Sequence, residues 1–130
     1  MSSSIATVVT LKLAKSAEFL LGAEVLEADM FDAAVSLAAS AAVNAVDVIQ
    51  LLAAGEIRQG RDHTQAVGTL RKAGQVRAAS NLSYCLSVKQ KAQYASKRCT
   101  AVESRTAVLR AQRILSRARQ LASEKGYVSE

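Results

Sequence analysis

The chain has 130 residues with no proline and no tryptophan, and 50% of its residues are hydrophobic although only 4% are aromatic. This length suits a single domain with one core. An interior of Ala, Leu and Val fits packed helices better than a sheet sandwich, so we expect an all-α, single-domain fold. The N-terminal residues lack the basic start and apolar run of a secretory signal, which predicts a cytoplasmic protein.

The net charge of +6 is distributed unevenly along the chain. Residues 1–70 hold four basic and eight acidic side chains, a net charge of −4, whereas residues 71–119 hold twelve basic side chains and one acid, Glu103, a net charge of +11. This asymmetry indicates a surface for a polyanion on the C-terminal helices, or a basic face that meets the acidic face of another subunit. An ordinary solvated helix surface is the third alternative.

The first two predicted helices span residues 11–28 and 29–54, after an N-terminal extension of residues 1–10. The first carries an apolar stripe at helical spacing, formed by Leu13, Ala17, Leu20 and Leu21. The second is far more apolar, and its polar residues recur every three or four positions, which predicts a face turned to solvent or to a second subunit. These residues are Asp29, Asp32, Ser36, Ser40, Asn44, Asp47 and Gln50. The alanines and the centrally placed aspartate favour a central bundle helix over a membrane span.

Glycines are expected to end the middle helices. Gly55 suits the end of the second helix, and Asp62 can cap a third helix that runs to about Lys72. A fourth helix follows the break at Gly74 and ends near Tyr94. Its predicted core positions are Ala78, Leu82, Cys85 and Ala92.

The fifth predicted helix begins with a capping box formed by Thr100 and Glu103. It has a core face and a separate basic face. The core face consists of Val108, Ala111, Leu115, Ala118 and Ala122, and the basic face of Arg110, Arg113 and Arg117. Residues 124–130 form a C-terminal tail.

The two cysteines, Cys85 and Cys99, are too few for a disulfide framework, and with His63 they do not match a four-ligand zinc pattern. We therefore expect buried free thiols. The sequence predicts no metal site and no cofactor.

Two segments after the Ala-rich second helix resemble HEPN domains, the small helical bundles of prokaryotic RNase toxins and defence systems. They are "GEIRQGRDHTQAV" at residues 55–67 and "LSYCLSVKQKAQYASKRCTAVESRTAVLRAQRILSRARQLA" at residues 82–122. The resemblance covers roughly residues 10–123. It implies a four- to five-helix up-and-down bundle over residues 11–123 that forms a homodimer.

The resemblance also implies a composite site in which paired Arg-x4-6-His motifs cut RNA without a metal ion. Arg58 and His63 match this spacing. An imidazole can move a proton to or from the 2′-hydroxyl, and the guanidinium can hold the scissile phosphate. However, Gln59 stands where the family often has Asn, Asp or His, and the family's motif commonly precedes the last helix. There this chain has Lys89 and Tyr94, an alternative, degenerate motif.

Two functions of different class therefore stay open. The first is a metal-independent endoribonuclease, a toxin or defence effector that works as a homodimer. The second is a non-catalytic HEPN module that binds a polynucleotide or a partner protein, such as a nucleotidyltransferase antitoxin, with His63 hydrogen-bonded structurally to a neighbouring helix. No membrane partner is expected. The candidate nucleic-acid-binding residues are Arg61, Lys89, Lys91, Arg110, Arg113 and Arg117.

Overall fold

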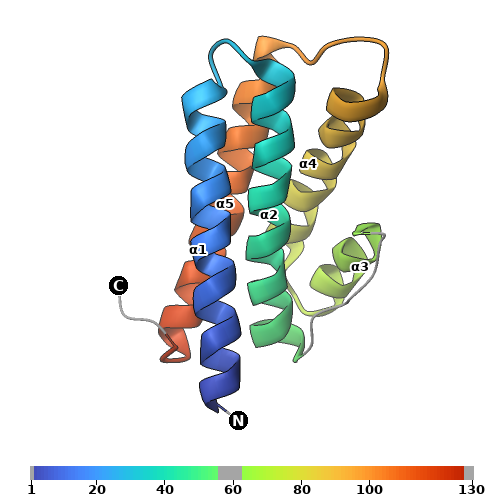
Figure 1. Ribbon diagram of the computed structural model, residues 1–130. Helices are drawn as coiled ribbons and strands as arrows, with labels where there is room; N and C mark the ends of the chain where they lie inside the picture. The colour runs from blue at the N-terminus through green and yellow to red at the C-terminus, as the bar shows by residue number, and fades with distance from the viewer. Residues whose placement is uncertain (1, 56–62, 128–130) are drawn as a thin grey trace.

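The computed structural model describes residues 2–55 and 63–127, which form an all-helical bundle (Figure 1). The helices are α1 (Ser2–Leu26), α2 (Phe31–Ala54), α3 (Thr64–Lys72), α4 (Val76–Tyr94) and α5 (Ala101–Glu124). The four long helices, α1, α2, α4 and α5, run alternately up and down, and the short α3 lies beside the lower part of α4 (Figure 1). The expected all-α architecture is confirmed.

Helix α2 is the centre of the bundle, because it packs against each of the other four helices. Its contact surface is made largely of alanines with no exposed area, among them Ala38, Ala41, Ala42 and Ala45. Such short side chains let neighbouring helices approach closely. By length and composition alone α2 could also cross a membrane, and 50% of its most apolar stretch is buried inside the bundle. The predicted central helix is confirmed.

The polar residues of α2 are half-buried except for Gln50, and several of them bond to other segments of the chain, so the expectation of a face turned outward is wrong at Gln50. Asp47 Oδ2 accepts a hydrogen bond from Lys12 Nζ of α1 at 2.8 Å, and Asp32 Oδ1 accepts one from the Cys99 N–H at 2.8 Å. The Cys99 hydrogen bond lowers the pKa of Asp32. Gln50 is only 1% exposed, and its Nε2 has no partner among the described residues. Spacing along α2 could not show that other segments cover these positions.

Helix α1 begins at Ser2 rather than at Leu11, so residues 2–10 of the predicted extension are helical. Its apolar residues have partners in the bundle, since Val9 is fully buried in the core. The predicted stripe is correct at Leu20, which is 8% exposed, and wrong at Leu21, which is 62% exposed. The buried face of α1 is therefore rotated away from Leu21.

The predicted breaks at Gly55 and Gly74 and the predicted capping box are confirmed, whereas α1 ends at Leu26 and α2 begins at Phe31 rather than at the predicted residues 28 and 29. Gly55 ends α2 with a φ of 84°, and its N–H donates to the Leu51 carbonyl. Gly74, with a φ of 79°, separates α3 from α4. At the start of α5 the Glu103 N–H donates to Thr100 Oγ1 at 3.1 Å, and the Thr100 N–H donates to Glu103 Oε1 at 2.8 Å. The capping box is complete.

The predicted core faces of α4 and α5 are also confirmed. The buried members are Ala78, Leu82, Cys85, Val108, Ala111, Leu115, Ala118 and Ala122, while Ala92 packs partly buried against the core. Both cysteines are free and buried, as expected. Burial raises the pKa of the Cys85 thiol to about 12 and that of Cys99 to about 11, so both thiols are poor nucleophiles at neutral pH.

Candidate nucleic-acid interface

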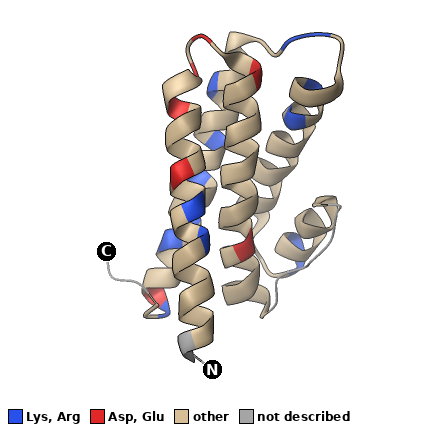
Figure 2. Cartoon of the chain, viewed as in Figure 1, with Lys and Arg blue, Asp and Glu red and all other residues tan. Residues whose placement is uncertain are grey.

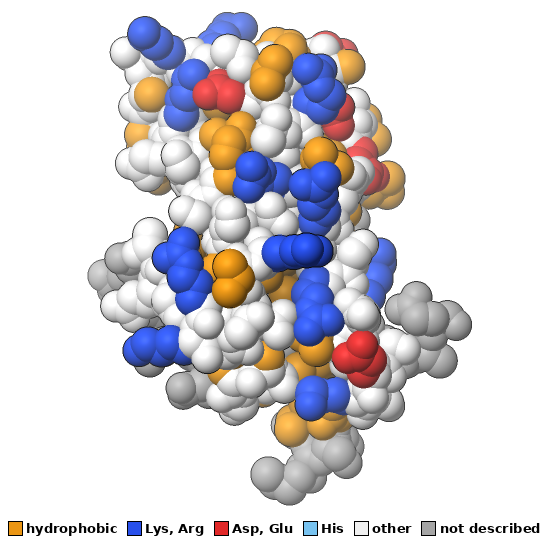
Figure 3. Space-filling model, turned by 180° about the vertical axis from the view of Figure 1, so that it is seen from behind, with side chains coloured by type: hydrophobic (Ala, Val, Ile, Leu, Met, Phe, Trp, Pro, Cys, Tyr) orange, Lys and Arg blue, Asp and Glu red, His pale blue; other side chains and the backbone are white. Residues whose placement is uncertain are grey.

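Acidic and basic side chains lie on different parts of the bundle. Acidic residues lie mainly on α1, α2 and the turn between them, whereas α4, α5 and the segment between them carry mainly basic residues (Figure 2). Seen from behind, the molecule shows a column of Lys and Arg side chains with few acidic ones among them (Figure 3). The charge asymmetry of the sequence is therefore also an asymmetry in space.

A groove lies between the beginning of α4 and the middle of α5. Its volume of about 800 Å³ lies within the range of about 300–1,000 Å³ found for ligand sites. None of the described residues that line it is an Asp or a Glu. The lining residues are Gly74, Gln75, Val76, Arg77, Ala78, Asn81, Leu109, Gln112, Arg113, Ser116, Arg117 and Gln120.

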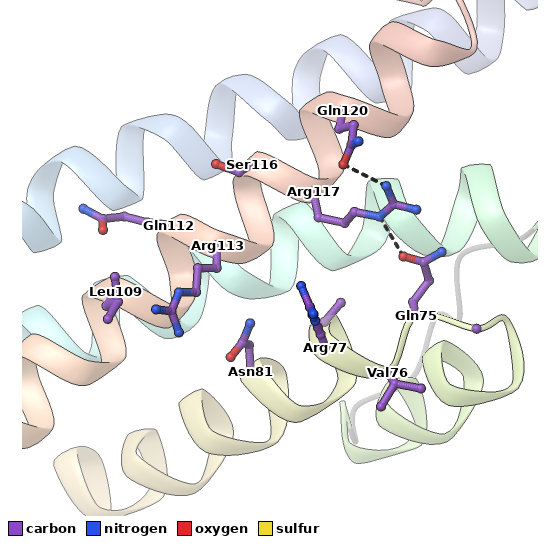
Figure 4. A pocket seen from close by; sticks show the side chains of 12 residues that line it. Gln75, Val76, Arg77, Asn81, Leu109, Gln112, Arg113, Ser116, Arg117 and Gln120 are labelled. Atoms are coloured by element: carbon purple, nitrogen blue, oxygen red, sulfur yellow. Dashed lines mark hydrogen bonds between the residues drawn. The ribbon is translucent and has the colours of Figure 1, made fainter.

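Three arginines extend into this groove from two helices (Figure 4). Arg77 comes from the first turn of α4, and Arg113 and Arg117 come from α5. The two α5 arginines are four residues apart, so they lie on the same face of the helix. Arg77 and Arg113 are exposed and Arg117 is half-buried. The packing of α4 against α5 thus brings together cations that are distant in the sequence.

Neutral amides, rather than carboxylates, hold Arg117 in place. Its Nε donates to Gln75 Oε1 at 2.9 Å, and its Nη1 donates to Gln120 Oε1 at 2.8 Å (Figure 4). An amide oxygen orients a guanidinium without neutralising it. The full positive charge of Arg117 is therefore available to a ligand.

Arg110 lies two turns before Arg117 on α5 and is held in the same way. Its Nη1 donates to Asn81 Oδ1 at 3.3 Å. Its guanidinium lies 4.8 Å from the centroid of the Tyr84 ring, a cation–π contact. Arg110 thus also has neutral partners on α4.

Lys91, another predicted nucleic-acid ligand, has a carboxylate partner. Its Nζ lies 2.9 Å from Glu103 Oε1 and 3.1 Å from Oε2. The hydrogen bond to Glu103 raises the pKa of Lys91, and the same hydrogen bond is the main cause of the lowered pKa of Glu103. Lys91 therefore ties the end of α4 to the first turn of α5 and is less available to an anion.

The predicted catalytic pair cannot be assembled from the described residues. Arg58 lies outside them, as do Arg61 and Asp62. His63 lies immediately before α3 and is half-buried, and its side chain makes no capping hydrogen bond and none to a neighbouring helix within the described part of the chain. Helix α3 has nine residues and is about 13 Å long, which separates His63 from the groove at its other end.

The alternative motif lies at the far end of α4. Lys89 is half-buried, and Tyr94, the last residue of the helix, is 72% exposed. The groove is lined by the opposite, N-terminal end of α4. The structure therefore places this motif away from the three groove arginines.

Of the groove residues, the sequence predicted Arg113 and Arg117, and those it missed include Gln75, Arg77, Asn81 and Gln120. Arg77 and Asn81 are four residues apart in a predicted helix, so their shared face was a readable signal. The sequence did not show which side of α4 packs against α5.

Comparison of the chain with models of protein families finds no match, and comparison with curated proteins finds none either. The chemistry of the chain must therefore be inferred from the groove and its surroundings.

Proposed function

We propose that this chain is a HEPN-like cytoplasmic module that binds RNA on the basic face formed by α4 and α5. The observation that carries the proposal is the meeting of Arg77, Arg113 and Arg117 in a groove with no carboxylate among its described lining residues. Like charges gathered in this way repel one another, and a bound polyanion removes that repulsion.

A polymer fits this face better than a single small anion does. The basic side chains continue beyond the groove as a column along the back of the molecule (Figure 3). An extended row of cations can contact several phosphates at once and release their condensed counterions. The face therefore has the arrangement expected for a nucleic-acid backbone.

The test is the salt dependence of RNA binding, measured by fluorescence anisotropy. RNA binding by the wild type should weaken steeply as salt rises. On a single strand, a plot of the logarithm of affinity against the logarithm of salt concentration should fall with a slope of about 0.7 for each phosphate contact. A variant with Arg110, Arg113 and Arg117 all replaced by Gln should bind more weakly to every RNA sequence and show a flatter slope. Failure of the wild type to bind RNA at low salt would contradict the proposal.

Endoribonuclease activity is a second candidate function, favoured by one observation. His63 is the only histidine, and its imidazole makes no capping hydrogen bond at the start of α3. The ring is thus not used as the cap of that helix and could act with Arg58. His63→Ala should abolish RNA cleavage and leave binding nearly intact, as read by RNA integrity and cell growth. If His63→Ala cleaves as well as the wild type, Lys89 and Tyr94 become the candidate pair.

We also propose that the chain forms a homodimer through α1. Exposed positions along α1 repeat with alternating spacings of three and four residues, as at the seam of two paired helices; they are Leu11, Ala14, Glu18, Leu21 and Val25. A second copy presents the same seam, so the two can pair about a two-fold axis. A nucleotidyltransferase antitoxin is the alternative partner for this chain.

Light scattering at micromolar concentration tests the dimer. Leu21 is 62% exposed, and Leu21→Glu should convert the dimer to a monomer. Val102→Glu, at a position of α5 that is 59% exposed, is the matched control and should remain dimeric. A monomeric wild type would contradict this part of the proposal.

A further inference from the structure

The groove between α4 and α5 offers mainly hydrogen-bond donors to a ligand. A guanidinium has only N–H donors and no acceptor. An amide that contacts a guanidinium must therefore turn its oxygen toward it, which leaves the amide NH₂ group free. This rule fixes the orientation of Gln75 and Gln120 beside Arg117, and that of Asn81 beside Arg110.

The NH₂ groups of these three amides add to the N–H groups of the arginines. Gln112 differs, because its Nε2 donates to Glu24 Oε2 of α1 at 2.7 Å. The groove is thus lined with donors of two kinds, charged and neutral. Phosphodiester oxygens, which only accept hydrogen bonds and carry negative charge, complement such a lining.

The position of Arg77 is not explained by the stability of α4. The first turn of α4 contains no acidic residue, and the side chain of Gln75 at the N-cap makes no capping hydrogen bond. A cation in the first turn is unfavourable, because that end of a helix already carries partial positive charge. An anion held between Arg77 and Arg113 would offset this cost.

The shape of the groove favours one strand over two. It lies between helices of a packed bundle, whose axes are typically about 8–10 Å apart. A duplex presents its phosphates on a wide convex surface, whereas a single strand can enter the concave space. No aromatic side chain is among the described lining residues, so stacking, worth about 1–3 kcal/mol per base elsewhere, does not hold the bases here.

We infer that the groove holds the phosphate backbone of single-stranded RNA and does not read its bases. This inference rests on the proposed function and adds to it the form of the RNA and the place where it is held. Arg77 and Arg113 contact phosphate oxygens, and the amides of Gln75, Asn81 and Gln120 donate further hydrogen bonds to them.

A pair of double variants with equal charge tests the place. Arg77→Gln with Arg113→Gln removes two exposed groove arginines, and Arg71→Gln with Arg119→Gln removes two exposed arginines that do not line the groove. Losing two charge-assisted contacts should weaken single-strand binding about tenfold or more. The control should lose only about threefold through reduced net charge. Circular dichroism checks that both variants are folded.

The RNA form is tested with wild type and three probes: a short oligouridylate, an oligoadenylate of equal length, and an RNA duplex of the same length. The two single strands should bind with similar affinity, and the duplex about tenfold more weakly. Equal or tighter binding of the duplex overturns the inference, as does equal weakening by the two double variants.

These outcomes separate the inference from the proposed function. If the wild type binds RNA and the two double variants lose the same affinity, the proposed function is retained and the assignment of the groove as the binding site is wrong. If the wild type binds no RNA at low salt, both fall. Binding of a poly-glutamate peptide in place of RNA would then assign the basic face to an acidic protein segment.

Discussion

Charged side chains have different kinds of partner on the α1–α2 side and in the groove of the α4–α5 face. Between α1 and α2, Lys12 pairs with Asp47 at 2.8 Å, and the buried Ser16 Oγ donates to the Ala41 carbonyl at 2.7 Å. In the groove, the partners of Arg117 among the described residues are amides. A charge paired with an opposite charge in the same chain contributes to the stability of the fold. A charge whose partners are neutral is not neutralised and can attract a charged ligand.

The two sides also differ in how tightly they are filled. The α2 surface that meets its neighbours is built from fully buried alanines, while the α4–α5 face contains an open groove. A larger side chain should therefore be resisted on the first side and tolerated on the second.

The largest expected effect comes from disturbing the alanine packing. Ala45 has no exposed area, so Ala45→Leu must displace a neighbouring helix and should reduce the free energy of unfolding by about 1–3 kcal/mol. Ala41→Leu should behave similarly. Urea denaturation measures the change, with Ala53→Leu at an exposed position of α2 as the control. Equal stability of Ala45→Leu and Ala53→Leu would show that the contact is not tight.

A smaller effect is expected when Arg117 of the groove is given a carboxylate partner, as Lys12 has in Asp47 on the α1–α2 side. Gln75→Glu places a carboxylate where Arg117 now has an amide oxygen at 2.9 Å. RNA affinity should fall about tenfold, because an internal carboxylate competes with phosphate. Stability should rise by up to about 1 kcal/mol, since an acid near a helix N-terminus is favourable.

Gln90→Glu is the matched control for this substitution. Gln90 is exposed on α4 and does not line the groove, and the change in net charge is the same. Its effect on RNA affinity should be small. Equal losses in the two variants would mean that the charge of the whole molecule, rather than the groove, decides binding.

The smallest effect concerns Lys91, which Glu103 pairs on the basic face. Hydrogen bonds from Lys91 and from the Thr100 N–H hold the pKa of Glu103 below its ordinary value. Its stabilising contribution is therefore fully present above the ordinary Glu pKa of about 4.3 and is lost as the pH falls through the lowered value in the folded chain.

Glu103→Gln tests this pH dependence, because glutamine can keep the capping box while losing the charge. The difference in unfolding free energy between wild type and Glu103→Gln should shrink as the pH falls below about 4. Urea denaturation at several pH values measures it. Glu124→Gln, at an exposed position at the end of α5 and outside the proposed dimer seam, is the matched control and should show no such trend.

Features encoded locally were predictable from the sequence. The glycine breaks at Gly55 and Gly74 and the capping box of Thr100 and Glu103 depend on residues only a few positions apart. The core face of α5 could be predicted because alanine and leucine recur there at helical spacing. The number of helices and most of their ends follow from such signals.

Features that depend on tertiary partners were not predictable. Leu21 fits the helical spacing of the α1 stripe, yet its side chain is exposed. The sequence predicted that Asp47 faces outward, because it does not show that Lys12 of α1 lies beside Asp47 in the fold. Only the α5 side of the groove could be predicted, since Arg113 and Arg117 were identified as part of a basic face of α5. Arg77 and its neighbours on α4 were not, because the sequence does not specify which turn of α4 meets α5.

The contacts of the last helix have a consequence for how the protein is made. Ser104 Oγ donates to the Glu27 carbonyl at 2.9 Å, and the Cys99 N–H just before α5 donates to Asp32. These contacts join residues that leave the ribosome early to residues that leave it late. Because α5 covers α2 and also forms one wall of the groove, we expect a nascent chain to gain its complete core and its RNA-binding face together, only after α5 has emerged.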